Sequence, residues 1–284
     1  MPQLIWQALG SFLRAGRLQL LEIEPWDWHD RRMKITTWNV NSLNVRLEQL
    51  LAYLAKEKPD IVALQETKVP DERFPLAELK SAGYQVQYSG QKSYNGVALL
   101  ARSELQDVVS ELAGLNDPQR RLLAATIDGV RVINVYIPNG EAVGSDKYRY
   151  KFRWLEALYG FLQQELQSYD RLILLGDFNI TPTDMDVHDP LRWQGKITCS
   201  EQERRFFASL LALGLEDGLR ALYPDRAMYS WWDYRSSGFR RGWGLRIDHL
   251  LLSDSLKVQA GDIDIAYRGL ERPSDHAPVW LQIE

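Results

Sequence analysis

Short β-prone apolar runs and longer stretches with helical spacing alternate along most of this chain. In residues 44–56 leucines recur every three or four positions, and residues 146–168 continue the same spacing, so both predict helices. Ser200 and Glu203 stand three positions apart, as in a capping box, and predict a third helix that runs to Leu213. A further helix is expected over the segment that Gly83 ends, residues 71–82.

The apolar runs between these stretches predict strands, because each is four to eight residues long and bounded by turn residues. Their alternation with helices predicts one domain in which two mixed sheets pack face to face with helices outside. The expected strands are residues 34–38, 61–64, 84–88, 96–101, 122–127, 130–136, 172–175, 245–252, 263–267 and 279–283.

Residues 1–32 differ from the remainder because they precede the first strand, which Met33 opens. Their apolar positions fit a short amphipathic helix, and the segment lacks the early positive charge of a signal peptide. We expect residues 1–32 to be a non-essential extension of a catalytic domain over 33–284. A chain that begins at Met33 should therefore fold and keep its activity.

Composition narrows the class of protein only moderately. Hydrophobic residues make up 45% and charged residues 25% of the 284 positions, as in ordinary globular proteins. The net charge of −4 argues against a protein that coats nucleic acid nonspecifically, but not against a nuclease with a local basic rim. The lone Cys199 fits a reducing cytoplasm, and the lack of an apolar run of about 18 residues predicts no membrane span.

Carboxylate, amide or imidazole side chains follow four of the apolar runs. The end of a strand is where an α/β protein presents chemistry at one edge of its sheet. A set of ligands rich in oxygen and nearly free of sulfur favours a Mg²⁺ or Mn²⁺ site that handles phosphate. Each alone is also typical of a turn or surface position, so the prediction depends on the combination. The residues are Asn39, Asn41, Glu66, Asp177, Asn179, Asp275 and His276.

Asp177 and Asn179 follow residues 172–175, whose apolar sequence predicts a buried central strand. If the extended backbone continues past Gly176, the two side chains point the same way and can hold a metal ion or a reacting water. The alternative is an Asx turn, in which the Asp177 side chain binds nearby backbone.

His276 is the candidate imidazole because Asp275 precedes it on a loop bracketed by prolines. Asp248 is the candidate carboxylate to orient that ring, and its alternative is a satisfied polar residue in a strand. Tyr136 ends another strand, where a phenol can donate a proton or hold a phosphate oxygen, although most such tyrosines belong to the core. No role is assigned to His188 or His249.

Several segments resemble the exonuclease III branch of the endonuclease/exonuclease/phosphatase superfamily, and the likeness extends from Met33 to the C-terminus. The resemblance implies a four-layer α/β sandwich, Mg²⁺ dependence with Mn²⁺ as the alternative, and attack of water on DNA phosphodiesters. Family members remove nucleotides from 3′ ends, and many also cut beside abasic sites in double-stranded DNA. The segments are residues 35–41, 64–68, 134–140, 176–182, 231–235, 244–252 and 273–279.

The resemblance also implies roles for individual residues. Asp177 is favoured to align or deprotonate the attacking water, and His276, supported by Asp248, binds or polarises a phosphate oxygen. Tyr136 assists near the phosphate or the leaving group. The implied metal ligands are Asn39, Glu66 and Asp275 at one subsite, with Asp177, Asn179 and His276 around the scissile phosphate and able to hold a second ion.

The DNA contacts are expected from a segment that interleaves aromatic residues with arginines, residues 229–244. Such a loop suits stacking on bases and contact with phosphates, and its alternative is a packed aromatic corner. By resemblance, Trp231 and Leu245 wall a pocket for a flipped-out abasic sugar, while Lys147 and Arg246 contact the DNA backbone.

The sequence is therefore compatible with three functions. The leading one is a monomeric, Mg²⁺-dependent DNA repair nuclease. The second is a phosphatase or phosphodiesterase of the same superfamily that acts on a small or lipid phosphate. The third is a DNA-binding protein without catalysis, which the complete set of expected ligands argues against.

Overall fold

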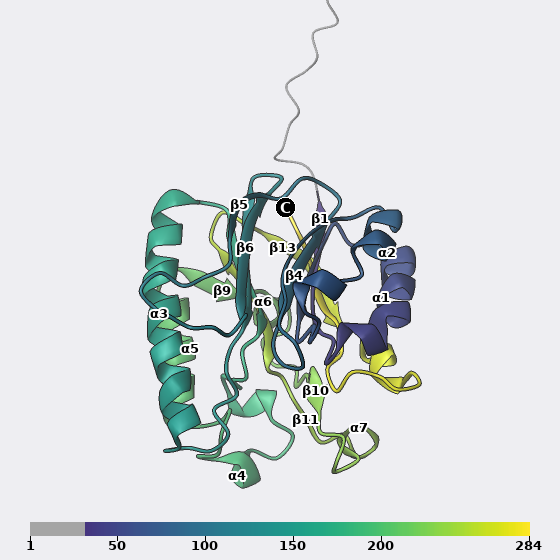
Figure 1. Cartoon of the computed structure of the whole chain (residues 1–284). Coiled ribbons are helices and arrows are strands. Elements are labelled where there is room, and N and C mark those ends of the chain that lie inside the picture. The colour runs from purple at the N-terminus through teal and green to yellow at the C-terminus, as the bar shows by residue number, and fades with distance from the viewer. Residues whose placement is uncertain (1–31) are drawn as a thin grey trace, which may run out of the picture. The chain divides into compact units, whose positions relative to one another are not determined.

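Two six-stranded sheets lie face to face in the computed structural model, which describes residues 32–284 (Figure 1). The first sheet has the order β13 (Val258–Ile263), β14 (Val279–Ile283), β1 (Met33–Asn39), β2 (Ile61–Gln65), β4 (Val97–Ala101) and β3 (Gln85–Ser89). The second has the order β5 (Gln106–Val109), β6 (Leu122–Ile127), β7 (Val130–Tyr136), β8 (Leu172–Asp177), β12 (Asp248–Ser253) and β9 (Leu215–Asp217).

Helices cover the outer face of each sheet (Figure 1). Helices α1 (Leu43–Glu57) and α2 (Leu76–Ser81) pack on the first sheet, and α3 (Asp146–Ser168) and α5 (Glu201–Leu211) pack on the second. The result is the predicted four-layer α/β sandwich. The shorter elements are η2 (Asp71–Arg73), η3 (Asp184–Asp186), α4 (Pro190–Trp193), α6 (Gly218–Leu222), β10 (Trp231–Trp232), α7 (Gly238–Arg241), β11 (Gly244–Leu245) and η4 (Ile265–Gly269).

An apolar core fills the space between the sheets, and a small polar cluster crosses it near the ends of the central strands. Asn134 of β7 donates to the backbone carbonyls of Leu64 and Ala98 across the interface, both at 2.9 Å. The Gln65 side chain donates to Asn134 Oδ1 at 2.7 Å. Because buried amides need partners, these bonds favour one alignment of the two sheets.

The centre of each sheet is a parallel pair of strands joined by a helix. In the first sheet β1 runs parallel to β2, and in the second β7 runs parallel to β8. The carboxyl ends of parallel neighbours lie at the same edge of a sheet. The residues at or just after these ends are Asn39, Glu66, Tyr136 and Asp177.

Several expected elements differ from the structure. Residues 263–267 are not a strand: β13 ends at Ile263, and a 3-10 helix, η4, follows it. The helix expected over 71–82 is divided into η2 and α2, because Pro75 cannot continue a helical hydrogen-bond ladder. The strand expected over 245–252 is interrupted between β11 and β12. The capping box at Ser200 is confirmed, and its helix ends at Leu211.

The extension expected over residues 1–32 lies outside the described residues except for its last position, so its role stays a prediction. Among residues 32–284, no helix combines the length and the apolar character that crossing a bilayer requires.

Candidate active site

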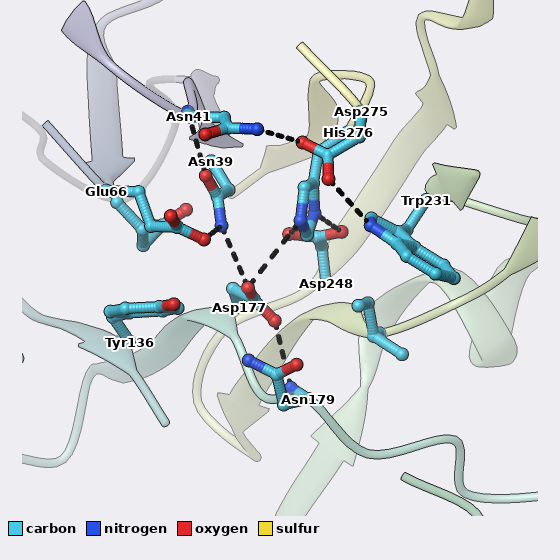
Figure 2. A network of polar contacts seen from close by, with 12 residues as sticks. Asn39, Asn41, Glu66, Tyr136, Asp177, Asn179, Trp231, Asp248, Asp275 and His276 are labelled. Atoms are coloured by element: carbon cyan, nitrogen blue, oxygen red, sulfur yellow. Dashed lines mark hydrogen bonds and ion pairs between the residues drawn. The ribbon is translucent and has the colours of Figure 1, made fainter. Parts of the chain in front are cut away.

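A pocket of about 300 Å³ opens where the central strands of both sheets end. Its polar side comes from the ends of β2, β7 and β8 and the loop before β14 (Figure 2). Its apolar side comes from Trp231, Leu245 and Ile247. The lining residues are Glu66, Tyr136, Asn139, Asp177, Asn179, Trp193, Ile197, Thr198, Trp231, Leu245, Ile247, Asp275 and His276.

Asn39 links the two sheets at the floor of this pocket. Its side-chain Nδ2 donates to Glu66 Oε1 at 2.8 Å and to Asp177 Oδ2 at 2.9 Å. Its Oδ1 accepts a hydrogen bond from the backbone of Asn41 at 3.0 Å. The amide nitrogen of Asn39 therefore faces the carboxylates, whereas its oxygen, the atom expected to bind a metal ion, is engaged elsewhere (Figure 2).

Asp177 is 1% exposed and ends β8. Its Oδ1 accepts from the backbone N–H of Asn179 at 2.9 Å, so the Asx turn weighed as an alternative is present and Asp177 still lines the pocket. Burial raises the pKa of Asp177 to about 7, with the His276 charge acting in the opposite direction and Asp248 adding to the rise.

Asp248 and His276 form the predicted pair. The Nδ1 of His276 lies 2.9 Å from Asp248 Oδ2, and its Nε2 lies 3.7 Å from Asp177 Oδ2. Ser230 donates to Asp248 at 2.6 Å and holds that carboxylate from the far side. Burial disfavours the imidazolium, but Asp248 and Asp177 outweigh it and raise the pKa of His276 to about 10. The ring therefore carries a positive charge toward the pocket.

A cation site is suggested by three side chains. Glu66, Asp177 and His276 each present a ligand atom, and these atoms lie within 4.8 Å of one another. Asp275, expected as a partner of Glu66, instead accepts hydrogen bonds from Trp231 Nε1 at 3.0 Å and Asn41 Nδ2 at 2.8 Å. The oxygen-rich cluster fits a hard cation such as Mg²⁺ better than a soft one.

Tyr136 stands beside Glu66 at the end of β7, as expected from the strand pattern. Burial and the nearby Glu66 charge hold the pKa of its phenol well above the ordinary value, although Arg121 partly offsets them. The Arg121 guanidinium lies over the Tyr136 ring, 4.5 Å from its centroid. The phenol is therefore a protonated hydrogen-bond donor at neutral pH.

The sequence analysis missed two residues beside these carboxylates. Lys68 Nζ lies 2.7 Å from Glu66 Oε2 and 2.5 Å from Asn41 Oδ1. Asn139 Nδ2 donates to Asn179 Oδ1 at 2.9 Å. Both lie within segments that carried the family resemblance, and an Asn or Lys three residues past a strand end was the available signal.

The four residues expected to contact DNA differ in their exposure and in their distance from the pocket. Trp231 and Leu245 lie opposite each other in β10 and β11 and line the pocket. Lys147 is exposed and lies 3.5 Å from Glu141 at the next pocket along the surface. Arg246 does not fit the expectation: it is 1% exposed and pairs with Asp186 at 2.6 Å and with Asp217 at 2.7 Å.

Arg246→Met should destabilise the fold by about 3–5 kcal/mol at pH 7, because it removes the buried guanidinium that Asp186 and Asp217 share and leaves Asp186 with Arg220 alone. Burial alone would raise the pKa values of Asp186 and Asp217, but Arg246 holds both below their ordinary value. Groups with lowered pKa values stabilise the fold above about pH 4 and lose that contribution as pH falls. The difference between wild type and variant in urea unfolding should therefore shrink from pH 5 toward pH 2.

The control is Arg205→Met, which removes an exposed i,i+4 pair with Glu201 and should change stability little. Equal effects of the two substitutions would contradict a structural role for Arg246.

Comparison with known proteins agrees with this geometry. The chain is 38% identical over 267 residues to exodeoxyribonuclease III of Haemophilus influenzae, covering 89% of this chain and all of that protein. Among solved structures it is similar to the 3′ phosphatase NExo from Neisseria, bound to a product DNA hairpin (52% identity, TM-score 0.88, 89% of this chain and 99% of that one). It is also similar to an AP endonuclease from Archaeoglobus fulgidus (39% identity, TM-score 0.84, 88% and 98%).

A family model described as Endonuclease/Exonuclease/phosphatase family matches residues 36–276, which include all of the pocket residues described above. The resemblance inferred from the sequence and the expected class of hydrolytic enzyme are thereby confirmed. The match covers most of the described chain, and this protein therefore belongs to the Endonuclease/Exonuclease/phosphatase family.

Proposed function

We propose that this chain is a Mg²⁺-dependent DNA repair nuclease that removes nucleotides from 3′ ends and cleaves beside abasic sites. The observation that carries the proposal is the junction of Glu66, Asp177 and His276 on the floor of one pocket, with Asp248 behind the imidazole. The relatives named exodeoxyribonuclease III and AP endonuclease support the choice of DNA as the substrate.

Each side chain of the proposed site has a separate role in an in-line displacement at phosphorus. The Asp177 carboxylate, oriented by Asn39 and Asn179, aligns the water and accepts its proton as the oxygen attacks. The His276 imidazolium donates to a phosphate oxygen on which negative charge grows, and Asp248 keeps the ring charged and oriented. The Tyr136 phenol donates a hydrogen bond near the leaving oxygen.

Glu66 and Asp177 are the side chains that would hold the metal ion, because the protonated His276 ring beside them has no free lone pair to bind a cation. When bound, Mg²⁺ supplies positive charge that neutralises the phosphate oxygens. The fit depends on Glu66, because its carboxylate is partly exposed in the pocket and can exchange its Lys68 contact for a cation. Mn²⁺ prefers similar oxygen ligands and is the expected substitute.

A second pocket of about 450 Å³ adjoins the first, and we propose that the DNA strand passes along both. It shares Tyr136 and Asn139 with the first pocket and adds the cationic side chains of Arg121 and Lys147. We expect the exposed Lys147 to contact a phosphate of the bound strand, while Arg121, which is bonded to the Tyr136 carbonyl, adds positive charge beside it.

The aromatic–arginine segment supports contact with DNA on the other side of the pocket. Two guanidinium groups lie over the Trp243 ring, with Arg241 at 4.6 Å and Arg192 at 5.5 Å from its centroid. The His188 ring stacks on Trp243 at 5.9 Å. The stacked rings form a packed aromatic corner, which was the alternative to a DNA-binding loop. The side chains of Arg192, Arg240 and Arg241 are nevertheless exposed.

The proposal includes action as a monomer. The single cysteine, Cys199, is buried and free, which supports a cytoplasmic location.

A DNA 3′-phosphate is a second candidate substrate, favoured by the likeness to a 3′ phosphatase.

One gel experiment tests these activities together. Three labelled duplexes, with an internal abasic-site analogue, a recessed 3′-hydroxyl end or a 3′-phosphate, are incubated with Mg²⁺ or with EDTA. Cleavage at the analogue identifies an abasic endonuclease, a ladder shrinking from the 3′ end an exonuclease, and a mobility shift of the intact strand a 3′ phosphatase. The absence of any Mg²⁺-dependent product would contradict the proposal and favour a small phosphoester substrate or binding without catalysis.

Trp231→Ala should reduce abasic cleavage more than 3′ exonuclease activity, by about tenfold in the ratio of the two kcat/KM values. The reason is that its ring forms the apolar wall of the pocket and its Nε1–H holds Asp275. Trp231→Phe is the matched variant that keeps a wall but loses that hydrogen bond. Equal loss of both activities in Trp231→Ala would identify Trp231 as a packing residue instead.

A further inference from the structure

A fully buried lysine lies beneath the catalytic pocket. Lys151 projects from α3, and its ammonium is 0% exposed. Its Nζ donates to the backbone carbonyl of Asn179 at 2.8 Å, to that of Asn139 at 3.3 Å and to Glu203 Oε1 at 2.5 Å. Three donors thus meet three acceptors, so the ammonium is satisfied without water.

Its partner, Glu203, extends the same network to a third loop. The other carboxylate oxygen of Glu203 accepts from the Ser200 backbone at 3.0 Å and the Ser200 hydroxyl at 2.6 Å. Its Oε1 also accepts from the Thr198 backbone at 3.1 Å. Helices α3 and α5, which lie side by side on the outer face of the second sheet (Figure 1), are therefore joined through this pair.

The loops that meet at this pair are the ones that form one wall of the pocket. They are the segments after β7, after β8 and before α5, and they contribute Asn139, Asn179, Ile197 and Thr198 to its lining. Gly140 allows the close approach, because a Cβ there would lie 3.2 Å from Cδ of Lys151. Asn179 is also the residue whose backbone N–H orients Asp177 (Figure 2).

A buried ion pair is a weak source of stability, because the loss of hydration roughly cancels the attraction between the charges. Apolar side chains in place of both members would fill this site at modest cost to the fold, whereas an apolar side chain in place of Lys151 alone would leave Glu203 buried without its counter-charge. What an apolar side chain lacks is a donor for the carbonyl oxygens of Asn139 and Asn179. The specific contribution of Lys151 is therefore geometric.

We propose that Lys151, held by Glu203, is a positioning residue that fixes the Asn139–Asn179 wall against Asp177. The expected effect on kcat rests on the proposed nuclease function. The expected effect on the order of the two loops rests on the hydrogen bonds of Lys151 alone. Lys151 acts through backbone carbonyls and does not touch the substrate.

The test compares Lys151→Met with wild type in two measurements. On a 3′-recessed duplex with saturating Mg²⁺, kcat should fall by about 10–100-fold while KM changes by less than about threefold, since small displacements of a catalytic group cost that much. In hydrogen–deuterium exchange, the amides of residues 177–181 and 137–141 should exchange at least about tenfold faster. Glu203→Gln should change both quantities in the same direction by less, and it replaces Lys151→Met if that variant does not fold.

The matched control is Arg131→Met, which removes another buried cation bound to α3, through Glu165, outside the pocket. It should lower the melting temperature and leave kcat of the folded enzyme unchanged. A Lys151→Met protein with a lowered melting temperature but normal kcat and normal exchange at residues 177–181 would overturn the positioning role. If wild type cleaves no DNA, the proposed function fails, and the exchange measurement alone decides between the two roles of Lys151.

Discussion

Asp177→Asn should reduce DNA cleavage by at least about 10³-fold, while the protein still folds and binds duplex DNA. The substitution keeps the volume of the side chain and the oxygen that accepts from the Asn179 backbone. It removes the charge that would accept the proton of water and hold the cation, and general-base catalysis alone contributes about 10²–10⁴-fold. Single-turnover cleavage on a denaturing gel and fluorescence anisotropy of a labelled duplex measure the two quantities.

The same variant should melt close to the temperature of wild type, because two effects oppose each other. Burial raises the pKa of Asp177, so removing its charge favours the folded state. The new Nδ2, however, faces Asn39 Nδ2, which donates to the oxygen of the wild-type side chain. Asp254→Asn, an exposed change at the end of β12, is the control and should alter neither cleavage nor melting. Full cleavage by Asp177→Asn would remove Asp177 from the role of aligning the water.

Glu66→Gln should reduce cleavage by about 10²-fold or more at low Mg²⁺ and recover part of it at high Mg²⁺. The amide keeps the oxygen that accepts from Asn39 but loses the negative charge that attracts the cation, and Lys68 loses its counter-charge. Isothermal titration with Mg²⁺, without DNA, should show weaker binding. This readout does not depend on the identity of the substrate.

Glu57→Gln is the control variant, because it makes the same substitution at another glutamate that pairs with lysine. Glu57 is a partly exposed carboxylate that lies 2.9 Å from the ammonium groups of Lys34 and Lys56, far from the pocket residues in the fold. Its replacement should leave Mg²⁺ binding and cleavage unchanged. If Glu66→Gln and Glu57→Gln have the same effect on Mg²⁺ binding, Glu66 is not a ligand of the ion.

The arrangement of the site explains why polar residues after separate apolar runs were informative together. Asn39 and Asp177 belong to different sheets and stand 138 positions apart, yet a 2.9 Å hydrogen bond joins them. Each follows a strand of a parallel pair, and the packing of the two sheets brings these strand ends to one edge. A strand end is predictable from local sequence, so the candidates were predictable as well.

Predictions were wrong where the same local sequence pattern is compatible with two different structures. Residues 263–267 have strand-like composition, but β13 precedes them and the chain turns into η4. Arg246 follows a pocket residue, so the resemblance implied contact with DNA, yet Asp186 and Asp217 approach it from other parts of the chain. Lys151 gave no signal at all, because a lysine on a helix is usually exposed and only its long-range partners explain its burial.

Local sequence was sufficient to predict the alternation of strands and helices, the start of α5 at its capping box, and the polar residues at the strand ends. These depend on periodicity and on neighbours a few positions apart, which the order of residues contains directly. Only the tertiary structure shows that Asn39 turns its nitrogen to the carboxylates, that His276 lies between Asp248 and Asp177, and that Arg246 and Lys151 are buried. Those properties depend on hydrogen bonds, charges and desolvation contributed by residues far apart in the chain, and only folding brings such residues within reach.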